Sequence, residues 1–288
     1  MANRTVLVTG ASTGIGRESA LLLARQGFTV FAGVRRPVDG EALVEASSGT
    51  LIPLLIDVTD SDQIASTAAA IAAHGDGLDG LVNNAGIASA APLEFIPIEE
   101  FRRQIEVNLT GQLAVTQAML GMLRASRGRI VNVTSIGGLI AGQMLGPYNA
   151  SKFALEGITH VLRQELQPWG IEVIAIEPGQ IATPIWGTAA ANSDRMLADL
   201  PPVVNELYGR RIAGAQKMAA HAAKHGIHPL EVAQVIEKAL TAKRPKTRYP
   251  VGRDAKLGAA LIARLPDRTR DRLLGGRTDP EHQDARKP

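Results

Sequence analysis

The chain has 288 residues, of which 45% are hydrophobic and 20% charged, so it can form one large or two small globular domains. It contains no cysteine, which excludes disulfides and thiolate metal sites. No segment reaches the roughly 18 uninterrupted apolar residues that a membrane-spanning helix requires, and the N-terminal sequence leaves no room for a signal peptide. We therefore expect a soluble, cytoplasmic protein.

Short apolar runs alternate along the chain with segments of helical periodicity. The runs are residues 4–9, 28–34, 50–56, 78–83, 128–135 and 171–177, and residues 247–252 could return one last strand to the sheet edge. The helical segments are residues 15–26, 61–74, 99–124 and 147–167. This alternation predicts an α/β fold, with a doubly wound, mostly parallel Rossmann sheet and helices on both faces. Runs that are apolar at nearly every position are typical of strands buried on both faces.

The first strand and the first helix are joined by a turn that contains Gly10, Gly14 and Gly16. Glycines at such a turn let the backbone approach a pyrophosphate, while free N–H groups and the helix dipole attract its charge. The spacing is Gly-x-x-x-Gly-x-Gly, whereas many dinucleotide folds have Gly-x-Gly-x-x-Gly. Three glycines can also be plain turn residues, so the motif predicts a nucleotide site only together with others.

The sequence YNASK, residues 148–152, places Tyr148 and Lys152 on one face of a predicted helix. A phenol has an ordinary pKa of about 10, and a cation within about 4 to 6 Å favours the phenolate. We therefore expect Lys152 to lower the pKa of Tyr148 and to make the phenol a usable acid or base. Taken alone, each side chain is also compatible with an ordinary surface position.

Together these motifs resemble the short-chain dehydrogenase/reductase family. The resemblance continues in order through "DV" at 57–58, "NNAG" at 83–86, Asn108, Ser135, YNASK and "PGQIAT" at 178–183, over nearly two-thirds of the chain. Several segments are most similar to the retinol and hydroxysteroid dehydrogenase branch. The resemblance implies an NAD(P)-dependent enzyme that interconverts a hydroxyl and a carbonyl by hydride transfer.

The same resemblance implies roles for individual residues. Tyr148 would be the general acid or base, Ser135 would bind the substrate oxygen, and Lys152 would also bind the nicotinamide ribose. Asn108 would complete a proton relay, although an asparagine within a helix can instead serve the backbone. No metal is expected. The implied cofactor contacts are Gly10, Ser12, Thr13, Gly14, Ile15, Gly16, Arg35, Asp57, Val58, Asn84, Ala85, Gly86, Tyr148, Lys152, Pro178, Gly179, Ile181 and Thr183.

The choice between NAD and NADP is normally made at the end of the second strand. Here Arg35 and Arg36 follow that strand, and no acid occurs before Asp39. Because an arginine there accommodates the 2′-phosphate, we favour NADP, with Arg35 as the contact. NAD stays open, because Thr13 stands where many NADP-using relatives carry a basic residue.

Two segments lie outside the strand and helix alternation of this single domain, residues 1–288. Residues 183–226 are predicted to form a helical substrate lid over an apolar pocket, which favours a small hydrophobic alcohol or ketone. Residues 253–288 form a basic C-terminal extension, for which we favour docking on the protein itself or a partner subunit over a membrane surface. Nucleic-acid binding is not expected, because the extension lacks interleaved aromatics and a known binding module.

Relatives usually pair through the helices that correspond to residues 99–124 and 147–167, so a homodimer or homotetramer is expected.

The first alternative to an enzyme is a catalytically silent dinucleotide-binding sensor or scaffold. The intact set of Ser135, Tyr148 and Lys152 disfavours it. The second alternative, an epimerase or dehydratase of the longer sugar-nucleotide-using relatives, is opposed by the glycine spacing and the short C-terminal region.

Overall fold

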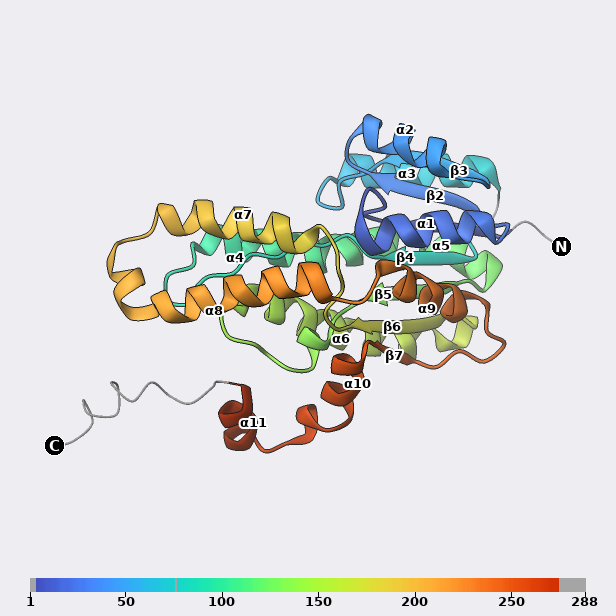
Figure 1. The fold of residues 1–288 in the computed structure, drawn as a ribbon. Coiled ribbons are helices and arrows are strands. Elements are labelled where there is room, and N and C mark those ends of the chain that lie inside the picture. The colour runs from blue at the N-terminus through green and yellow to red at the C-terminus, as the bar shows by residue number, and fades with distance from the viewer. Residues whose placement is uncertain (1–3, 76, 275–288) are drawn as a thin grey trace.

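The computed structural model describes residues 4–75 and 77–274, and a seven-stranded sheet forms its centre (Figure 1). The strand order is β3-β2-β1-β4-β5-β6-β7, and all neighbouring strands of this sheet pair in parallel. The predicted doubly wound sheet is thereby confirmed, including its seventh strand. The strands are β1 (Thr5–Val8), β2 (Thr29–Val34), β3 (Leu51–Leu55), β4 (Gly80–Asn83), β5 (Arg129–Val133), β6 (Glu172–Pro178) and β7 (Arg248–Val251).

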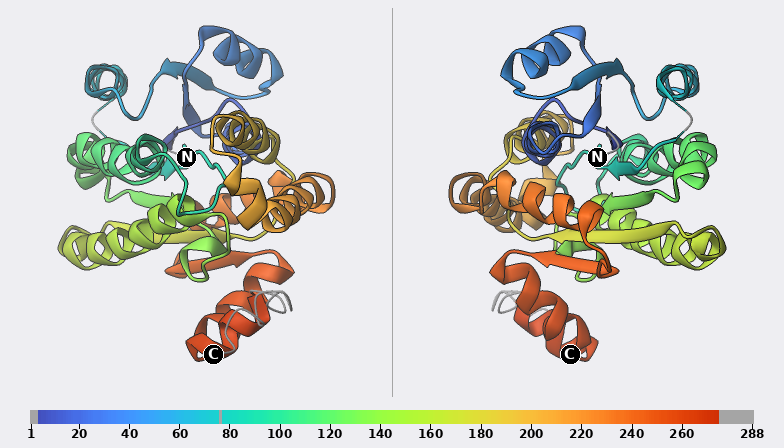
Figure 2. Two further views of the ribbon diagram at one scale, coloured as in Figure 1. Left: turned by 90° about the vertical axis from the view of Figure 1, so that its left-hand side faces the viewer. Right: turned by 90° about the vertical axis from the view of Figure 1, so that its right-hand side faces the viewer.

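Helices cover both faces of the sheet (Figure 2). Helices α1 and α9 pack together on one face, and α3, α5 and α6 cover the other. The predicted helix at 99–124 contains one wider π-helical turn, Glu106–Thr110, between α4 and α5. Helices α2 and α9 lie outside the predicted segments. The helices are α1 (Gly14–Arg25), α2 (Pro37–Ala46), α3 (Ser61–His74), α4 (Ile98–Ile105), α5 (Gly111–Ser126), α6 (Gly146–Leu166), α7 (Ile185–Ala198), α8 (Val203–His225), α9 (Pro229–Thr241), α10 (Arg253–Ala260) and α11 (Asp267–Leu274).

The strands are apolar at successive positions because each of them contributes to two cores. Val6 and Val8 belong to the apolar cluster under α1 and α9, whereas Leu7 belongs to the cluster on the opposite face. All three side chains are fully buried. Successive residues of a strand point to opposite faces, so a two-sided sheet leaves no solvent-facing position in its central strands.

The strand order reverses between β1 and β4, where open α/β sheets bind their ligands. Thr9, directly after β1, holds the two sides of this switch point together. Its hydroxyl oxygen accepts hydrogen bonds from the backbone N–H groups of Asn84 and Ala85, each at 3.0 Å. The side-chain amide of Asn84 donates in return to the Thr9 carbonyl oxygen at 2.9 Å. The glycine turn and the NNAG turn therefore form one unit.

Helices α7 and α8 lie beyond the carboxyl ends of the strands and occupy the segment predicted as a lid (Figure 1). Ser193 of α7 ties this helix to the loop after β4, since its hydroxyl oxygen accepts from the N–H of Ala90 at 2.7 Å. The C-terminal extension begins with α10 and α11; its residues 275–288 lie outside the described residues. Within the described chain, no helix is long and apolar enough to cross a membrane.

Candidate active site

The glycine turn is shaped to receive a phosphate group. Gly10 and Gly14 have φ angles of +64° and +56°, which residues other than glycine rarely adopt. A Cβ on Gly16 would overlap the Gly10 carbonyl oxygen and would lie 2.5 Å from the side-chain nitrogen of Asn84. Thr13 precedes α1 in an extended conformation and makes no capping hydrogen bond, and the first turn of α1 carries no acid. The uncapped amides at this helix start therefore fit the pyrophosphate of a dinucleotide.

The nicotinamide side of the predicted cofactor site adjoins this turn. A Cβ on Gly14 would lie 3.1 Å from the side-chain methyl of Thr183, so the two loops are in direct contact. Ile181 is 4% exposed and pairs through its backbone with Ile227 ahead of α9. The structure thus brings the glycine turn and the PGQIAT loop together, although they are about 170 residues apart in the sequence.

The adenosine side lies at the ends of β2 and β3. The Asp57 carboxylate accepts from the N–H and the hydroxyl of Thr59 at 3.0 and 2.7 Å, and Val58 is buried. Arg35 and Arg36 are both exposed. Arg36 pairs with Asp39 at 2.6 Å, and this contact raises the pKa of Arg36 and lowers that of Asp39.

Arg35 differs from its neighbour in its partners. It forms no ion pair with an acidic residue in the described part of the chain, whereas Arg36 is engaged by Asp39. Arg35 is therefore the arginine that can turn to a 2′-phosphate without breaking an existing ion pair. Of the two residues, it is also the one predicted from the sequence as the phosphate contact.

Ser135, Tyr148 and Lys152 lie together beside the end of β5. Tyr148 is hydrogen-bonded to Ser135, whose hydroxyl oxygen also accepts from the N–H of Gly137 at 2.9 Å. A Cβ on Gly137 would lie 3.3 Å from both the Ser135 oxygen and the Tyr148 ring. The Lys152 nitrogen lies 5.9 Å from the centre of that ring. The three predicted catalytic residues therefore lie close together.

Burial dominates the electrostatics of this group. Burial raises the pKa of Tyr148 above its ordinary value, and the hydrogen bond with Ser135 only partly offsets the effect. Burial also lowers the pKa of Lys152 to about 8, against the opposing effect of the Glu156 carboxylate. The expected lowering of the pKa of Tyr148 by Lys152 is thus wrong for this structure, in which desolvation of the phenol is the larger effect.

Asn108 lies in the π-helical turn and is fully buried. Its side-chain oxygen accepts from the N–H of Ile87 at 2.8 Å, and its nitrogen donates to the Ile87 carbonyl and the Ser151 hydroxyl at 2.9 and 3.0 Å. A Cβ on Gly86 would lie 3.4 Å from this oxygen and 3.9 Å from the Lys152 nitrogen. Asn108 therefore borders the catalytic group, and its amide supports the backbone there.

Charged residues beneath α6 were not predicted as part of the site. Glu156, one helical turn beyond Lys152, is 5% exposed and pairs with Arg248 of β7 at 2.7 Å. Arg248 also pairs with Glu177 of β6 and contacts His160. Burial, followed by the nearby Glu156 carboxylate, raises the pKa of Glu177. These long-range pairs have no local sequence signal.

A cavity of about 100 Å³ lies under α7 and α8. Trp186 and Leu197 of the predicted lid line it, whereas Val203 and Leu207 are 39% and 48% exposed. Most of the wall is small or apolar and carries no charged side chain. Its residues are Ala88, Ala90, Ala91, Gln143, Met144, Leu145, Gln180, Trp186, Ala189, Ala190, Ser193, Leu197, Ile212, Ala215, Gln216, Met218, Ala219 and Ala222.

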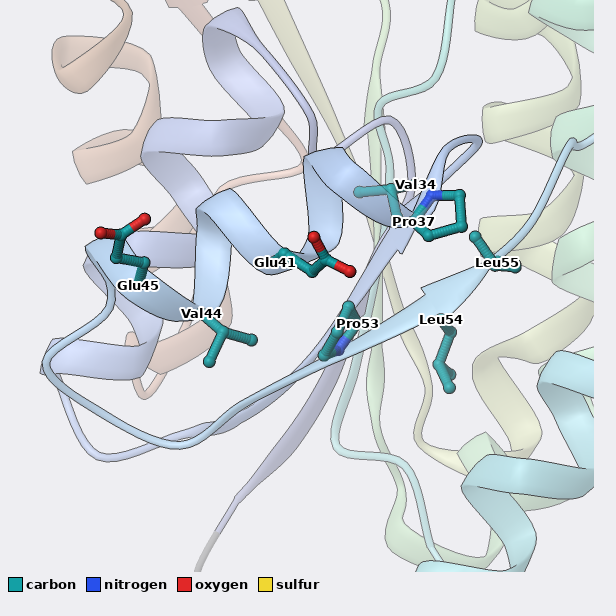
Figure 3. A pocket seen from close by; sticks show the side chains of 8 residues that line it. All are labelled: Val34, Pro37, Glu41, Val44, Glu45, Pro53, Leu54 and Leu55. Carbon is teal, nitrogen blue, oxygen red and sulfur yellow. The ribbon is translucent and has the colours of Figure 1, made fainter.

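A larger open groove of about 520 Å³ lies at the far edge of the sheet, between α2 and β3 (Figure 3). Val34, Pro37 and Leu55 line one end, and Glu41 and Glu45 add carboxylates along α2. None of the predicted catalytic residues lines this groove. Size alone therefore does not identify the reaction site, which is better located by the converging polar groups.

Comparison with known proteins agrees with this geometry. Residues 4–194 match the family model described as short chain dehydrogenase. An NADPH-dependent 3-dehydrocapnine reductase from Ornithobacterium rhinotracheale is 35% identical over 278 residues, covering 94% of this chain and 96% of that protein. Retinol dehydrogenase 5 from Mus musculus is 36% identical over 277 residues, covering 93% of this chain and 87% of that protein.

Solved structures extend the likeness to the fold. A short-chain dehydrogenase from Streptomyces avermitilis superimposes with a TM-score of 0.74 at 28% identity, covering 89% of this chain and 91% of that chain. The structural likeness thus extends over most of the chain. These matches show that the chain belongs to the short-chain dehydrogenase family of NAD(P)-dependent oxidoreductases.

Proposed function

We propose that this protein uses NADP to interconvert a hydroxyl and a carbonyl on a small hydrophobic substrate, with Tyr148 as the general acid or base. The observation that carries the proposal is the close approach of Ser135, Tyr148 and Lys152 at the carboxyl edge of the sheet. This edge also holds the glycine cradle. A silent sensor or scaffold would not need these three polar groups to converge.

The proposed roles follow from the chemistry of each side chain. NADP, when bound, supplies or accepts the hydride at its nicotinamide ring. The hydroxyls of Ser135 and Tyr148 bind the substrate oxygen, and Tyr148 passes a proton at its phenolic oxygen. Because burial keeps the pKa of Tyr148 high, the phenol stays protonated at neutral pH and is ready to donate to a carbonyl.

Lys152 and Asn108 complete the proposed site. Lys152, whose pKa is lowered to about 8, would bind the ribose of the nicotinamide and hold positive charge beside the phenol. Asn108 keeps the loop at residue 87 and the start of α6 in place through its amide bonds. Among the remaining predicted contacts, the residues between Gly10 and Gly16 and between Asn84 and Gly86 would hold the pyrophosphate and the ribose.

Two observations support NADP over NAD. In the described structure Arg35 forms no close ion pair with a carboxylate, although its charge helps to lower the pKa of Asp39, while Arg36 pairs directly with Asp39 at 2.6 Å. A relative that matches over 94% of this chain is named as NADPH-dependent. An exposed arginine without a close ion pair at the end of the second strand suits the 2′-phosphate of NADP.

The cavity supports a hydrophobic substrate. Its lining is rich in alanine, methionine and leucine and offers only neutral polar groups such as Gln143 and Ser193. A charged substrate would lose hydration there without gaining a partner.

We propose residues 183–226 as the lid of this single domain. Phe153, Val161 and Trp169, which are 44%, 51% and 48% exposed on or just after α6, support the expected homodimer or homotetramer.

The proposal is tested with a panel of apolar alcohols and ketones, each incubated with purified protein and either NADP(H) or NAD(H). Absorbance of the reduced nicotinamide reports turnover, and we expect at least one apolar pair to react faster with NADP(H). A charged hydroxy acid serves as the control substrate. Tight cofactor binding without turnover across the panel would instead favour the sensor or scaffold.

A further inference from the structure

The carboxylate of Asp254, near the start of α10, fills a space that two glycines leave open. Its Oδ2 atom accepts a hydrogen bond from the N–H of Gln180 at 2.7 Å. A Cβ on Gly179 would overlap both carboxylate oxygens, and a Cβ on Gly252 would lie 2.5 Å from one of them. Gly252 has a φ of +104°, which favours glycine. The contact therefore involves four residues from two segments.

Gln180 belongs to the loop at residues 178–183, which begins with the last residue of β6, leads toward α7 and adjoins the glycine turn through Thr183. The backbone of this loop is held at several points. The N–H of Gly179 donates to the Val251 carbonyl at 2.9 Å, and the N–H of Ile227 donates to the Gln180 carbonyl at 3.0 Å. Asp254 adds a side-chain acceptor from the C-terminal extension. The conformation of the loop thus depends on a residue 74 positions further along the chain.

Helix α10 also contacts the residue that follows Ser135. Gly258, one turn after Asp254, is buried, and a Cβ there would lie 2.8 Å from the end of the Ile136 side chain. Ile136 directly follows Ser135. Ala255, between them, is fully buried. Helix α10 therefore contacts both the loop at residues 178–183 and the loop that presents the Ser135 hydroxyl.

From this arrangement we infer that Asp254 is a positioning residue, which holds the loop at residues 178–183 in the conformation that receives the nicotinamide half of the cofactor. The inference rests on the proposed function. A loop that is already held in place loses less conformational freedom when the ligand binds. Removal of the carboxylate should therefore weaken binding of the nicotinamide end and leave binding of the adenosine end unchanged.

Calorimetric titration of the full chain tests this split with two ligands. One is NADP⁺, and the other is 2′-phospho-ADP-ribose, which lacks only the nicotinamide. We expect Asp254→Ala to bind NADP⁺ about tenfold more weakly, an effect typical of one lost charged hydrogen bond, and to bind 2′-phospho-ADP-ribose as the unaltered protein does. Asp254→Asn keeps an acceptor oxygen of similar position and should recover most of the affinity.

Asp267→Ala is the matched control. Its carboxylate lies in the same C-terminal extension, is 83% exposed and pairs with Arg270, three residues further along the chain, at 2.5 Å. Binding of both ligands should be unchanged in this variant. If Asp254→Ala does not fold, Asp254→Glu decides by the same comparison, because its longer side chain cannot fit between Gly179 and Gly252 and should weaken NADP⁺ binding selectively.

The outcomes separate the inference from the proposed function. Equal weakening of both ligands, or unchanged NADP⁺ affinity in the substituted proteins, would overturn the positioning role alone. Failure of the unaltered protein to bind either ligand would reject the proposed function and the inference with it. A selective loss for NADP⁺ that asparagine restores supports the inference.

Discussion

The ammonium of Lys152 donates a hydrogen bond of 2.9 Å to the backbone carbonyl of Val133, the last residue of β5. This contact joins α6, which carries the phenol, to the strand that leads into Ser135. The side chain is 5% exposed, and its carboxylate neighbour Glu156 lies a full helical turn away. The Lys152 ammonium is therefore held by a backbone carbonyl, and burial raises the free energy of its protonated form in the folded protein.

Replacement of Tyr148 by phenylalanine removes the proposed proton donor and leaves the ring. We expect kcat to fall by about 10² to 10⁴, as for loss of a general acid, while NADPH affinity stays within a few-fold. Turnover assays and calorimetry measure the two quantities. Tyr249→Phe is the control, because that hydroxyl lies outside the lid and the catalytic group and accepts from the N–H of Lys246 at 2.9 Å. Comparable loss in both variants would contradict the assigned role.

The lowered pKa of Lys152 predicts a pH dependence of stability. The folded protein releases this proton near pH 8, whereas the unfolded chain holds it up to the ordinary value of 10.5. Between these values the unfolded state binds more protons, so stability rises with pH. Relative to Lys152→Met, the free energy of unfolding should increase by about 2 kcal/mol from pH 7.5 to 9.5.

Urea unfolding of both proteins at the two pH values checks this difference. Subtracting the data for Lys152→Met removes the contribution of the other titrating groups. A difference in unfolding free energy that does not change with pH would mean that Lys152 keeps its proton in the folded protein.

The Glu156 carboxylate partly offsets the lowering of the Lys152 pKa by burial, so it should influence the pH dependence of kcat/KM. In Glu156→Gln, the pKa of Lys152 should fall below about 8, because the nearby negative charge is gone. We expect the limb of kcat/KM that reports Lys152 to move to lower pH. Glu165→Gln, on an exposed position of the same helix, should leave the profile in place. A shift toward higher pH would show that Glu156 acts in another way.

Adjacent arginines allow a paired test of cofactor choice. Arg35→Ala should weaken NADPH binding by about tenfold and leave NADH binding unchanged, since a charge-assisted contact to phosphate is lost. Arg36→Ala should affect both cofactors equally and weakly, because Arg36 pairs with Asp39. Affinities from fluorescence titration separate the two. The proposed 2′-phosphate contact is rejected if the two variants behave alike.

The glycine cradle predicts that position 16 tolerates no side chain. In Gly16→Ala the new methyl group would overlap the Gly10 carbonyl, so we expect loss of dinucleotide binding and a lower melting temperature. Gly121→Ala in α5 is the control, since nothing lies within 4 Å of its added methyl group. That change should be neutral or stabilise by up to about 1 kcal/mol. Normal NADP⁺ affinity in Gly16→Ala would argue against the cradle.

Local patterns explain which parts of the fold were predictable. The strands and most helices follow from apolar runs and glycine stops, and Ser135, Tyr148 and Lys152 follow from motifs. Most residues of the cavity wall could not be predicted, because many are alanines, which contribute little to a hydrophobic pattern in the sequence. The predicted direction of the pKa shift of Tyr148 was wrong, because the burial that raises this pKa arises from tertiary packing. The contacts of Asp254 and Glu156 could not be predicted, because they join distant parts of the sequence. Asp254 lies 74 positions from Gln180, and Glu156 lies 92 positions from Arg248.

The ion pairs of Arg248 have a consequence for synthesis on the ribosome. Two buried carboxylates, Glu156 and Glu177, precede their shared cation, and Glu177 is separated from it by 71 positions. A nascent chain that ends before β7 would have to bury both acids without compensation. We therefore expect α6 to reach its native packing only after the last strand has emerged, late in translation.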